Sequence, residues 1–329
     1  MGIFRSIFTV AHVVIVLLLG ATMLNAYIPP KVFPLLNLLS LAFPFLMIAN
    51  LLLCVFWIIS WRKRAFVFLL ISTLFLTPVR RWINYSEPKS EKADFKVLTF
   101  NNKYNDYGLE EVKNYIKSFN ADVIFLQESG YSGLGNSDFE EMKYSLHNRR
   151  ISFFSKYQIV EQDTIPLIDK GKSVYADVII KGKRIRFINV YLEPFQLHKS
   201  MVKPTDDLEE NGTKAKSLVR RFMPVFKKHE EQVQILKNFI EKSPYPVILA
   251  GDFNSVPNSY EYYTISGVLK DCFLESGTGL ATSFHDYKIP IRIDYVFSSD
   301  NLKSTEYKVD RSQKLSDHYP VLVKFSLKD

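Results

Sequence analysis

The stretch VILAGDFN at residues 247–254 is an apolar run that ends abruptly in glycine, aspartate and asparagine. A buried strand that stops in this way delivers its polar residues to the edge of a sheet. Five further segments place polar side chains at one end of an apolar run: VLTFNN at 97–102, VIFLQE at 123–128, INVYL at 188–192, RIDYVF at 292–297 and SDHYPV at 316–321. Carboxylate and amide oxygens gathered at one sheet edge suit a hard cation and a phosphate group.

Strand and helix patterns alternate between these segments. Apolar residues at helical spacing predict helices at 109–119 and 229–241, and the stretch at 193–228 before the second helix is polar. Runs with strand character lie at residues 95–100, 123–126, 151–160, 175–180, 184–192, 247–250, 293–298 and 319–325. Strands and helices in this order imply a layered α/β fold, and 329 residues suffice for one domain of roughly 200–250 residues beside a smaller unit.

The net charge of +8 belongs to the first quarter of the chain. Residues 1–85 carry seven Lys and Arg and no acidic residue, which leaves 35 basic against 34 acidic residues in the remainder. Residues 86–329 therefore have a formal charge of only +1. This balance argues against DNA as a partner, although a neutral average can include a basic groove.

The first quarter is predicted to lie in a membrane. Residues 7–27 and 32–60 are each long enough to cross a hydrocarbon core of about 30 Å. A cleavable signal peptide is disfavoured because no A-x-A-like site precedes a polar sequence. A third run at 65–79 spans only about 22 Å as a helix. We therefore expect two or three transmembrane helices in residues 1–85 of a multi-pass cell-membrane protein, with the lipid bilayer as a partner and no protein partner implied.

The third run decides on which side of the membrane the rest of the chain lies. Three spans with Arg62–Arg64 inside place the polar domain outside the cytoplasm, which is the arrangement we expect, but leave Arg80 and Arg81 outside. Two spans with the third run in the interface fit the positive-inside rule better and keep the domain in the cytosol. The charged residues 86–94 are expected to link this segment to a domain at 95–329.

Several common metal and nucleotide sites lack their parts in this sequence. There is no HExxH motif and no Walker loop, and the two cysteines, Cys54 and Cys272, cannot form a disulfide framework or a metal cluster. Scattered single Glu, Asp and Asn residues instead match the few oxygen ligands that Mg²⁺ prefers.

The strand-end segments resemble the endonuclease/exonuclease/phosphatase (DNase I-like) superfamily. GDFN, RIDYVF and SDHYP follow one another in the order of its motifs, and ISFFSKYQIV at 151–160 is similar to another of its strands. The resemblance runs from about residue 95 to 327, and the whole chain is most similar to the family's membrane-anchored bacterial branch. It implies a four-layer α/β sandwich after an N-terminal transmembrane segment. The implied activity is that of a membrane-anchored, metal-dependent phosphoesterase that cleaves phosphodiester or phosphomonoester bonds by direct attack of water.

The resemblance also implies a role for each site residue. The residues implied to bind the metal ion, Mg²⁺ or alternatively Mn²⁺, are Glu128, Asn101 and Asp317. The implied catalytic residues are Asp252, Asn254, His318, Asp294 and Tyr191. The residues implied to contact the substrate phosphate are Asn101, Asn254, His318 and Lys103.

Two residues depart from the family's pattern. Tyr191 stands where many members have a histidine that assists the leaving group, and a phenol can donate a hydrogen bond there. Lys103 stands where some nucleases have an aspartate in the metal site. We therefore expect one metal ion, with Lys103 facing the phosphate.

Other readings of the chain stay open at this point. A catalytically inactive membrane protein of the same fold would bind a phosphorylated ligand without turnover. Within the enzyme class, the substrate can be a nucleic acid, a phospholipid or a small phosphoester. The basic residues in the stretch 214–228 can attract lipid headgroups, but acidic residues surround them, which favours a solvated helix face.

Overall fold

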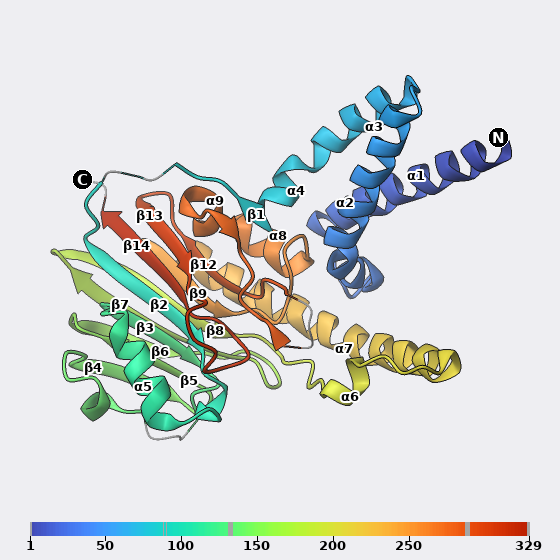
Figure 1. The fold of residues 1–329 in the computed structure, drawn as a ribbon. Coiled ribbons are helices and arrows are strands. Elements are labelled where there is room, and N and C mark those ends of the chain that lie inside the picture. Colours follow the sequence, from blue (N-terminus) through green and yellow to red (C-terminus); the bar gives the residue numbers. More distant parts are fainter. Residues whose placement is uncertain (1, 88, 90, 131–133, 287–289, 328–329) are drawn as a thin grey trace.

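The chain folds into an N-terminal group of helices and an α/β sandwich (Figure 1). The computed structural model describes residues 2–87, 89, 91–130, 134–286 and 290–327. The helices project from one side of the sandwich, with the N-terminus at their far end, and the C-terminal strand lies on the opposite side.

Within the described residues, the sandwich contains two six-stranded sheets. Their strand orders are β13-β14-β2-β3-β5-β4 and β10-β12-β9-β8-β7-β6. The bounds are β2 (Phe95–Asn101), β3 (Val123–Gln127), β4 (Tyr144–Asn148), β5 (Ile151–Ser155), β6 (Ile159–Ile165), β7 (Lys172–Ile180), β8 (Lys183–Tyr191), β9 (Val247–Asp252), β10 (Lys270–Asp271), β12 (Asp294–Ser298), β13 (Leu302–Val309) and β14 (Val321–Leu327). The pairs β2–β3 and β8–β9 are parallel, so within each pair the carboxyl ends lie at the same sheet edge.

Helices cover the outer face of each sheet, while the inner faces pack on each other around an apolar core that includes Phe187. Helix α5 (Leu109–Ser118) covers the first sheet with Val112 and Ile116. Helix α7 (Leu208–Glu241) covers the second with Val233 and Leu236. Shorter helices complete the sandwich: α6 (Lys199–Val202), α8 (Tyr260–Ser266) and α9 (Cys272–Ser276). The described residues thus form the predicted four-layer α/β sandwich, which is confirmed.

Helix α7 corrects the sequence-based helix prediction. The predicted helix begins at His229, whereas α7 begins at Leu208 and continues for 34 residues, or about 51 Å at 1.5 Å per residue. Asp207 caps its first turn by accepting hydrogen bonds from the backbone N–H groups of Glu209 and Glu210. The first half projects beyond the sheet (Figure 1), so no sheet face requires an apolar stripe there, and the polar sequence hid the helix.

The N-terminal helices begin with α1 (Gly2–Met23) and a 3₁₀ turn (Leu24–Ala26), followed by α2 (Leu35–Ile59). Helix α3 (Arg64–Ser72), a second 3₁₀ turn (Thr73–Phe75) and α4 (Leu76–Arg80) then follow without a gap. Within residues 2–87, two helical stretches are long and apolar enough to cross a membrane, Ile3–Ala26 and Leu35–Ile59. The short strand β1 (Ile83–Asn84) pairs with β11 (Gly279–Leu280), so the chain joins the sandwich before residue 86.

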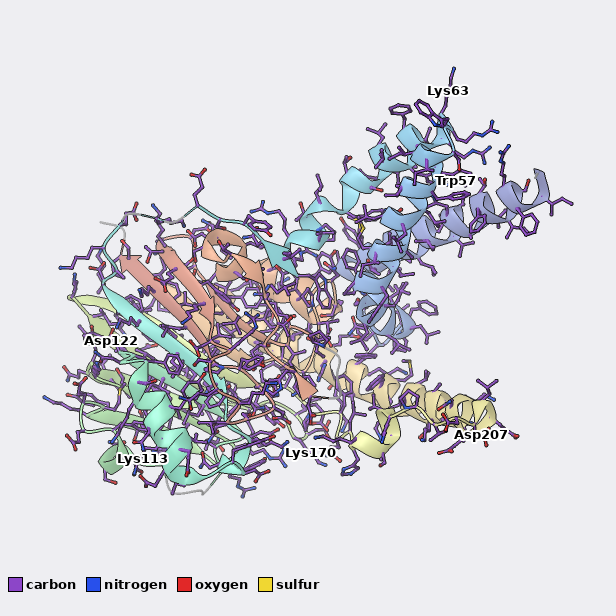
Figure 2. The ribbon with its side chains drawn as sticks, in the orientation of Figure 1. Trp57, Lys63, Lys113, Asp122, Lys170 and Asp207 are labelled. Atoms are coloured by element: carbon purple, nitrogen blue, oxygen red, sulfur yellow. The ribbon has the colours of Figure 1, made fainter. Side chains whose placement is uncertain are left out.

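A buried polar network lies between these helices. Trp57 Nε1 donates a hydrogen bond to His12 Nδ1 at 3.1 Å, and His12 Nε2 in turn contacts Asn50 Oδ1 at 3.0 Å. Asn50 Nδ2 donates to Ser72 Oγ at 2.8 Å, and Ser72 donates to the carbonyl of Phe68. Figure 2 shows Trp57 and Lys63 toward the end of the helices that is remote from the sandwich. The network joins α1, α2 and α3 into one bundle.

A second polar cluster attaches this bundle to the sandwich. Asn37 of α2 accepts a hydrogen bond from the backbone N–H of Tyr260 and donates to Glu261 Oε2, both at 2.7 Å. Glu261 Oε1 contacts His229 Nδ1 of α7 at 2.7 Å, and His229 Nε2 donates to the carbonyl of Glu193 at 2.7 Å. Asn25 donates to the carbonyl of Asn258 at 3.0 Å. Helix α2 therefore has a fixed position beside α7 and α8.

Candidate active site

Neighbouring strands bring the predicted site residues to one edge of the sandwich. Asp252 ends β9, and in the sheet it lies opposite Tyr191 at the end of β8 and opposite Asp294 at the start of β12. Asn101 ends β2 in the other sheet, and Asn101 Nδ2 donates to Asp252 Oδ2 at 3.0 Å. Glu128 follows β3 directly. The strand ends of both sheets therefore meet, as the sequence predicts.

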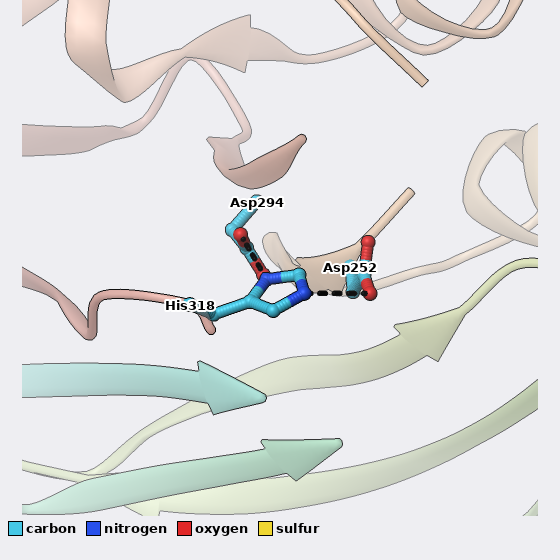
Figure 3. A group of neighbouring side chains, drawn as sticks. All are labelled: Asp252, Asp294 and His318. Carbon is cyan, nitrogen blue, oxygen red and sulfur yellow. Dashed lines mark hydrogen bonds and ion pairs between the residues drawn. The ribbon is translucent and has the colours of Figure 1, made fainter. Parts of the chain in front are cut away.

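His318 lies between two buried carboxylates (Figure 3). Its Nδ1 donates to Asp294 Oδ2 at 2.8 Å, and its Nε2 points toward Asp252 Oδ2 at 3.9 Å. The second distance exceeds a hydrogen bond, which ends near 3.2 Å for N–H···O. The Nε2–H group is therefore available to a further acceptor, such as a phosphate oxygen.

Burial and neighbouring charges shift the pKa values of His318 and Asp252. Burial by itself lowers the pKa of His318, but the negative charge of Asp294 and the hydrogen bond to it outweigh burial, so this pKa is raised. Burial raises the pKa of Asp252, and the neighbouring His318 charge only partly offsets this. The imidazole is thus biased toward the cation, and Asp252 is biased toward a stronger base than an ordinary aspartate.

Hydrogen bonds fix the orientation of Asp252. Besides Asn101, the backbone N–H of Asn254 donates to Asp252 Oδ1 at 2.7 Å. Asn254 itself has φ +47° and donates through Nδ2 to the carbonyl of Leu192 at 3.2 Å. Both carboxylate oxygens of Asp252 therefore have a donor before any substrate binds.

Gly251 permits the close approach of β9 and β8. Its φ is +145°, and a Cβ at this position would lie 1.9 Å from the carbonyl oxygen of Val190. Only glycine avoids this overlap with backbone. The glycine of GDFN is thus a packing requirement for placing Asp252.

Glu128 and Tyr191 form a second pair at the site. Tyr191 is 1% exposed, and its hydroxyl donates to Glu128 Oε1 at 2.7 Å. Burial, together with the charges of Glu128 and Asp252, raises the pKa of Tyr191, so the phenol stays a neutral donor. Glu128 has φ +49°, a left-handed conformation that non-glycine residues adopt rarely and that turns the chain at the strand end.

The donor set at this edge fits a hard divalent ion. Glu128 offers a carboxylate, and Asn101 offers an amide oxygen whose contact with the Lys103 backbone N–H, at 3.1 Å, leaves a second lone pair. Oxygen ligands of this kind suit Mg²⁺ or Mn²⁺. The cluster of Asp252, Asp294 and His318 has ligand atoms within 4.8 Å of one another, but its contacts are those of an oriented imidazole.

Asp317 and Lys103 pair with each other. Lys103 Nζ lies 2.9 Å from Asp317 Oδ2. Burial raises the pKa of Asp317, but His318 and Lys103 outweigh it and lower this pKa overall. The ammonium group thus already supplies a cation beside Asp317, and the expectation of a single metal ion stays a prediction. The metal-binding role of Asp317 and the phosphate-facing role of Lys103 stay predictions.

A cavity of about 790 Å³ opens over the strand ends. The following predicted site residues line it: Lys103, Glu128, Asp252, Asn254, Asp317 and His318. Three buried residues each hold one of them, because Asn101 bonds Asp252, Tyr191 bonds Glu128 and Asp294 bonds His318. The structure therefore brings all predicted site residues together.

The structure adds residues that the sequence reading missed. Ser283 Oγ accepts hydrogen bonds from the backbone N–H groups of Ile293 and Asp294, which fixes the start of β12. Nothing in the sequence around Ser283 signals this. Leu218, Phe222 and Phe226 of α7 also line the cavity, and their spacing of four residues is a helical signal within the polar stretch.

Comparisons with known proteins agree with this geometry. A family model described as "Endonuclease/Exonuclease/phosphatase family" matches residues 97–318, and one described as a domain of unknown function matches residues 5–82. A search of curated proteins found no match to the chain.

Solved structures share the fold at low sequence identity. The endonuclease/exonuclease/phosphatase of Bacteroides vulgatus is 18% identical with a TM-score of 0.51, and covers 72% of this chain and 100% of its own. A family protein of Bacteroides thetaiotaomicron is 15% identical with a TM-score of 0.52, covering 74% and 100%. Humanized D. rerio TDP2 with 14 mutations is 13% identical with a TM-score of 0.51, covering 70% and 98%. With its strand-end residues gathered at one cavity and this family's model matching two thirds of its length, the chain belongs to the endonuclease/exonuclease/phosphatase family.

Proposed function

We propose that the chain is a membrane-anchored, divalent-metal-dependent phosphoesterase that cleaves its substrate by direct attack of water. The observation that carries the proposal is His318, held between Asp294 and Asp252 at the polar end of the cavity. A buried imidazole with two carboxylate neighbours has few purely structural uses, and here its Nε2 is free to serve a reacting phosphate.

Each residue of the site has a defined task in this reaction. Asp252, with its raised pKa and fixed oxygens, accepts a proton from the attacking water. The His318 Nε2–H group, oriented by Asp294, donates to a phosphate oxygen and stabilises the charge that develops there. Tyr191 acts on Glu128, which it orients, rather than on the leaving group. Glu128 and Asn101 would hold the metal ion, which when bound neutralises phosphate oxygens.

We further propose that the sandwich lies outside the cytoplasm. Helices α3 and α4 return the chain from the remote end of the bundle, where Arg64 donates to Thr9 Oγ1 of α1, so this end also carries Arg62 and Lys63. The basic residues nearest the sandwich are engaged by it: Lys31 Nζ lies 2.5 Å from Glu231 Oε1, and Arg81 donates to Asn258 at 2.7 Å. The positive-inside rule then favours the remote end as the cytoplasmic one.

The test of activity uses the full chain in detergent with bis(p-nitrophenyl) phosphate and p-nitrophenyl phosphate. We expect hydrolysis with Mg²⁺, loss of hydrolysis with EDTA and its recovery on adding Mg²⁺ back. Glu128→Gln is expected to remove most activity, whereas Asp300→Asn, an exposed acid outside the site, retains it. Ligand binding without any product in the unaltered chain would favour the inactive receptor instead.

The test of topology is separate. A reporter enzyme that is active only outside the cytosol is fused to the C-terminus, and a reporter that fluoresces only inside is fused there in a parallel experiment. We expect the reporter enzyme to be active and the fluorescent reporter to show no fluorescence. The reverse pattern would place the sandwich in the cytosol.

A further inference from the structure

We propose that the substrate is a lipid phosphate ester, whose phosphate lies at the strand ends and whose hydrocarbon chain lies in an apolar groove between α2 and α7. This inference rests on the phosphoesterase function proposed above and names its substrate class. The lipid is drawn from the same bilayer that holds the N-terminal helices.

The cavity has charged side chains at the strand ends, and much of the wall beside them is apolar. Polar side chains also occur in that wall, including Asn37 of α2 and Gln196, His198 and Lys199 after β8. Leaving the strand ends, its wall consists of side chains from α2, the loop after β8 and α7. These include Leu41 and Phe45 of α2, Phe195, and Phe222 and Phe226 of α7. The ring of Phe195 lies 4.7 Å from that of Phe222 and 5.4 Å from that of Phe226, so the aromatic wall is continuous.

A cavity with charged groups at the strand ends and leucine and phenylalanine side chains beside them matches an amphiphile better than a nucleotide or a sugar phosphate. A polar substrate of the cavity's size, about 790 Å³, would leave its hydroxyl and ring nitrogen atoms facing leucine and phenylalanine. A nucleic acid needs cationic side chains along its path, but the lysines here are already paired: Lys103 with Asp317, and Lys199 Nζ with Asp286 at 3.1 Å. A hydrocarbon chain satisfies the apolar wall without needing a polar partner.

The groove opens onto the surface that a bilayer would cover. Helix α2 lines it with one face near its start, and the next turns of the same helix expose Ile48 and Leu52 at 57% and 66%. Phe45, at the groove, is itself 63% exposed. Apolar side chains exposed in a continuous row on one of the two membrane-length helices within residues 2–87 are what lipid tails contact. A lipid can thus pass sideways from the bilayer into the groove.

Helix α2 is a fixed wall rather than a chance neighbour. Asn37, which also lines the cavity, is 1% exposed and bonds both the backbone N–H of Tyr260 and the carboxylate of Glu261 at 2.7 Å. Ser40, one turn further on, donates to the carbonyl of Asn258 at 2.8 Å. These bonds tie the groove to the segment that follows Asp252 and Asn254, so the apolar wall and the site keep one geometry.

The experiment varies only the tail of the substrate. The full chain in detergent micelles with Mg²⁺ is assayed on ethyl p-nitrophenyl phosphate and hexadecyl p-nitrophenyl phosphate, which carry the same scissile bond. We expect kcat/KM to be at least tenfold higher for the hexadecyl ester. Ala42→Trp, which fills the α2 side of the groove, is expected to bring the ratio of the two values close to one. Leu218→Asn acts on the opposite wall and is expected to lower the same ratio.

A matched control separates the groove from general partition into micelles. Val55→Trp makes a comparable change at a position of α2 that is 50% exposed and away from the cavity, and it should keep the full ratio. Equal kcat/KM for the two esters, or a ratio that both groove variants leave intact, overturns the lipid inference while the phosphoesterase function stands. If neither ester is hydrolysed, the lipid inference is overturned. The phosphoesterase function is overturned with it if bis(p-nitrophenyl) phosphate and p-nitrophenyl phosphate are not hydrolysed either.

Discussion

Two of the buried histidines, His12 and His318, have opposite surroundings. In the helical bundle, His12 is fully buried and contacts only neutral partners, Trp57 and Asn50. At the strand ends, His318 is 6% exposed and has two carboxylates beside it and a cavity before it. The hydrogen bonds around His12 run in one direction from donor to acceptor and end on a backbone carbonyl.

The difference shows what distinguishes a structural histidine from one at a candidate active site. Burial is shared, and so is a hydrogen bond at Nδ1. Charge and access are not shared, because of these two histidines only His318 has charged partners and faces a cavity open to a ligand. The following experiments aim to break or sharpen this contrast.

The largest effect is expected from His318→Asn. The variant removes the group that donates to the phosphate, and loss of one such stabilising donor typically costs about 10²- to 10³-fold. We expect kcat on a short phosphodiester to fall within this range while the thermal unfolding temperature changes little. His147→Asn, at a histidine outside the site, should retain activity. A His318 variant with nearly full turnover would end the proposed mechanism.

The second largest effect is expected from Gly251→Ala, because Gly251 precedes Asp252, the neighbour of His318, and lets β9 lie close to β8. Gly251→Ala places a Cβ against the carbonyl of Val190, and overpacking of this kind costs about 1–3 kcal/mol or more. We expect a lower free energy of unfolding, measured by denaturant titration in detergent. Gly212→Ala in α7 meets nothing within 4 Å and should instead stabilise the chain by about 0.5–1 kcal/mol. Equal effects of the two changes would contradict the packing role of Gly251.

The third effect is expected from His12→Phe, which changes the buried histidine of the helical bundle. It leaves the Trp57 N–H group and Asn50 Oδ1 without their partner, and a buried polar group left unpaired costs about 1–3 kcal/mol. We expect a lower unfolding temperature in detergent with an unchanged kcat at permissive temperature. Val13→Phe, at a position that is 43% exposed, is the control and should change neither quantity. Loss of turnover without loss of stability would mean that the two histidines differ less than their surroundings indicate.

The smallest effect is expected from Tyr191→Phe. The variant removes only the hydrogen bond that orients Glu128, and loss of such a supporting bond weakens metal binding by about 10- to 100-fold. The Mg²⁺ concentration for half-maximal activity should rise by about tenfold, the lower end of that range, with little change in kcat at saturating Mg²⁺. Tyr175→Phe removes a similar bond to Glu161 on the surface and should have no effect. An unchanged Mg²⁺ requirement in the Tyr191 variant would remove Glu128 from the metal site.

Much of the site could be predicted because strand ends carry their own signal. The apolar runs before Asn101, Glu128 and Asp252 fixed where each strand stops, and parallel pairing then placed their polar residues together. The layered fold followed from the same pattern. The partners of these residues were not predictable, since the Tyr191–Glu128 and Lys103–Asp317 contacts join segments that the sequence leaves far apart.

Two other features escaped the sequence for physical reasons. The first half of α7 has no sheet beneath it, so its helical pattern is faint and Asp207 alone marks its start. The groove wall on α2 lies in a mostly apolar segment, where the sequence does not distinguish an apolar residue that lines a cavity from one on an outer face. Only the tertiary structure separates the two.

The contact from Asn37 through Glu261 and His229 to the carbonyl of Glu193 has a consequence for how this protein can change over time. The carboxylate that the bundle satisfies belongs to the sandwich, and the amide that satisfies it belongs to the bundle. Replacing the bundle by a segment without Asn37 would leave the buried carboxylate of Glu261 without this partner. Replacing the sandwich by one without Glu261 would leave the buried amide of Asn37 without its acceptor. We therefore expect the helical bundle and the sandwich to be inherited as one unit, with substitutions at position 37 accompanied by substitutions at 261.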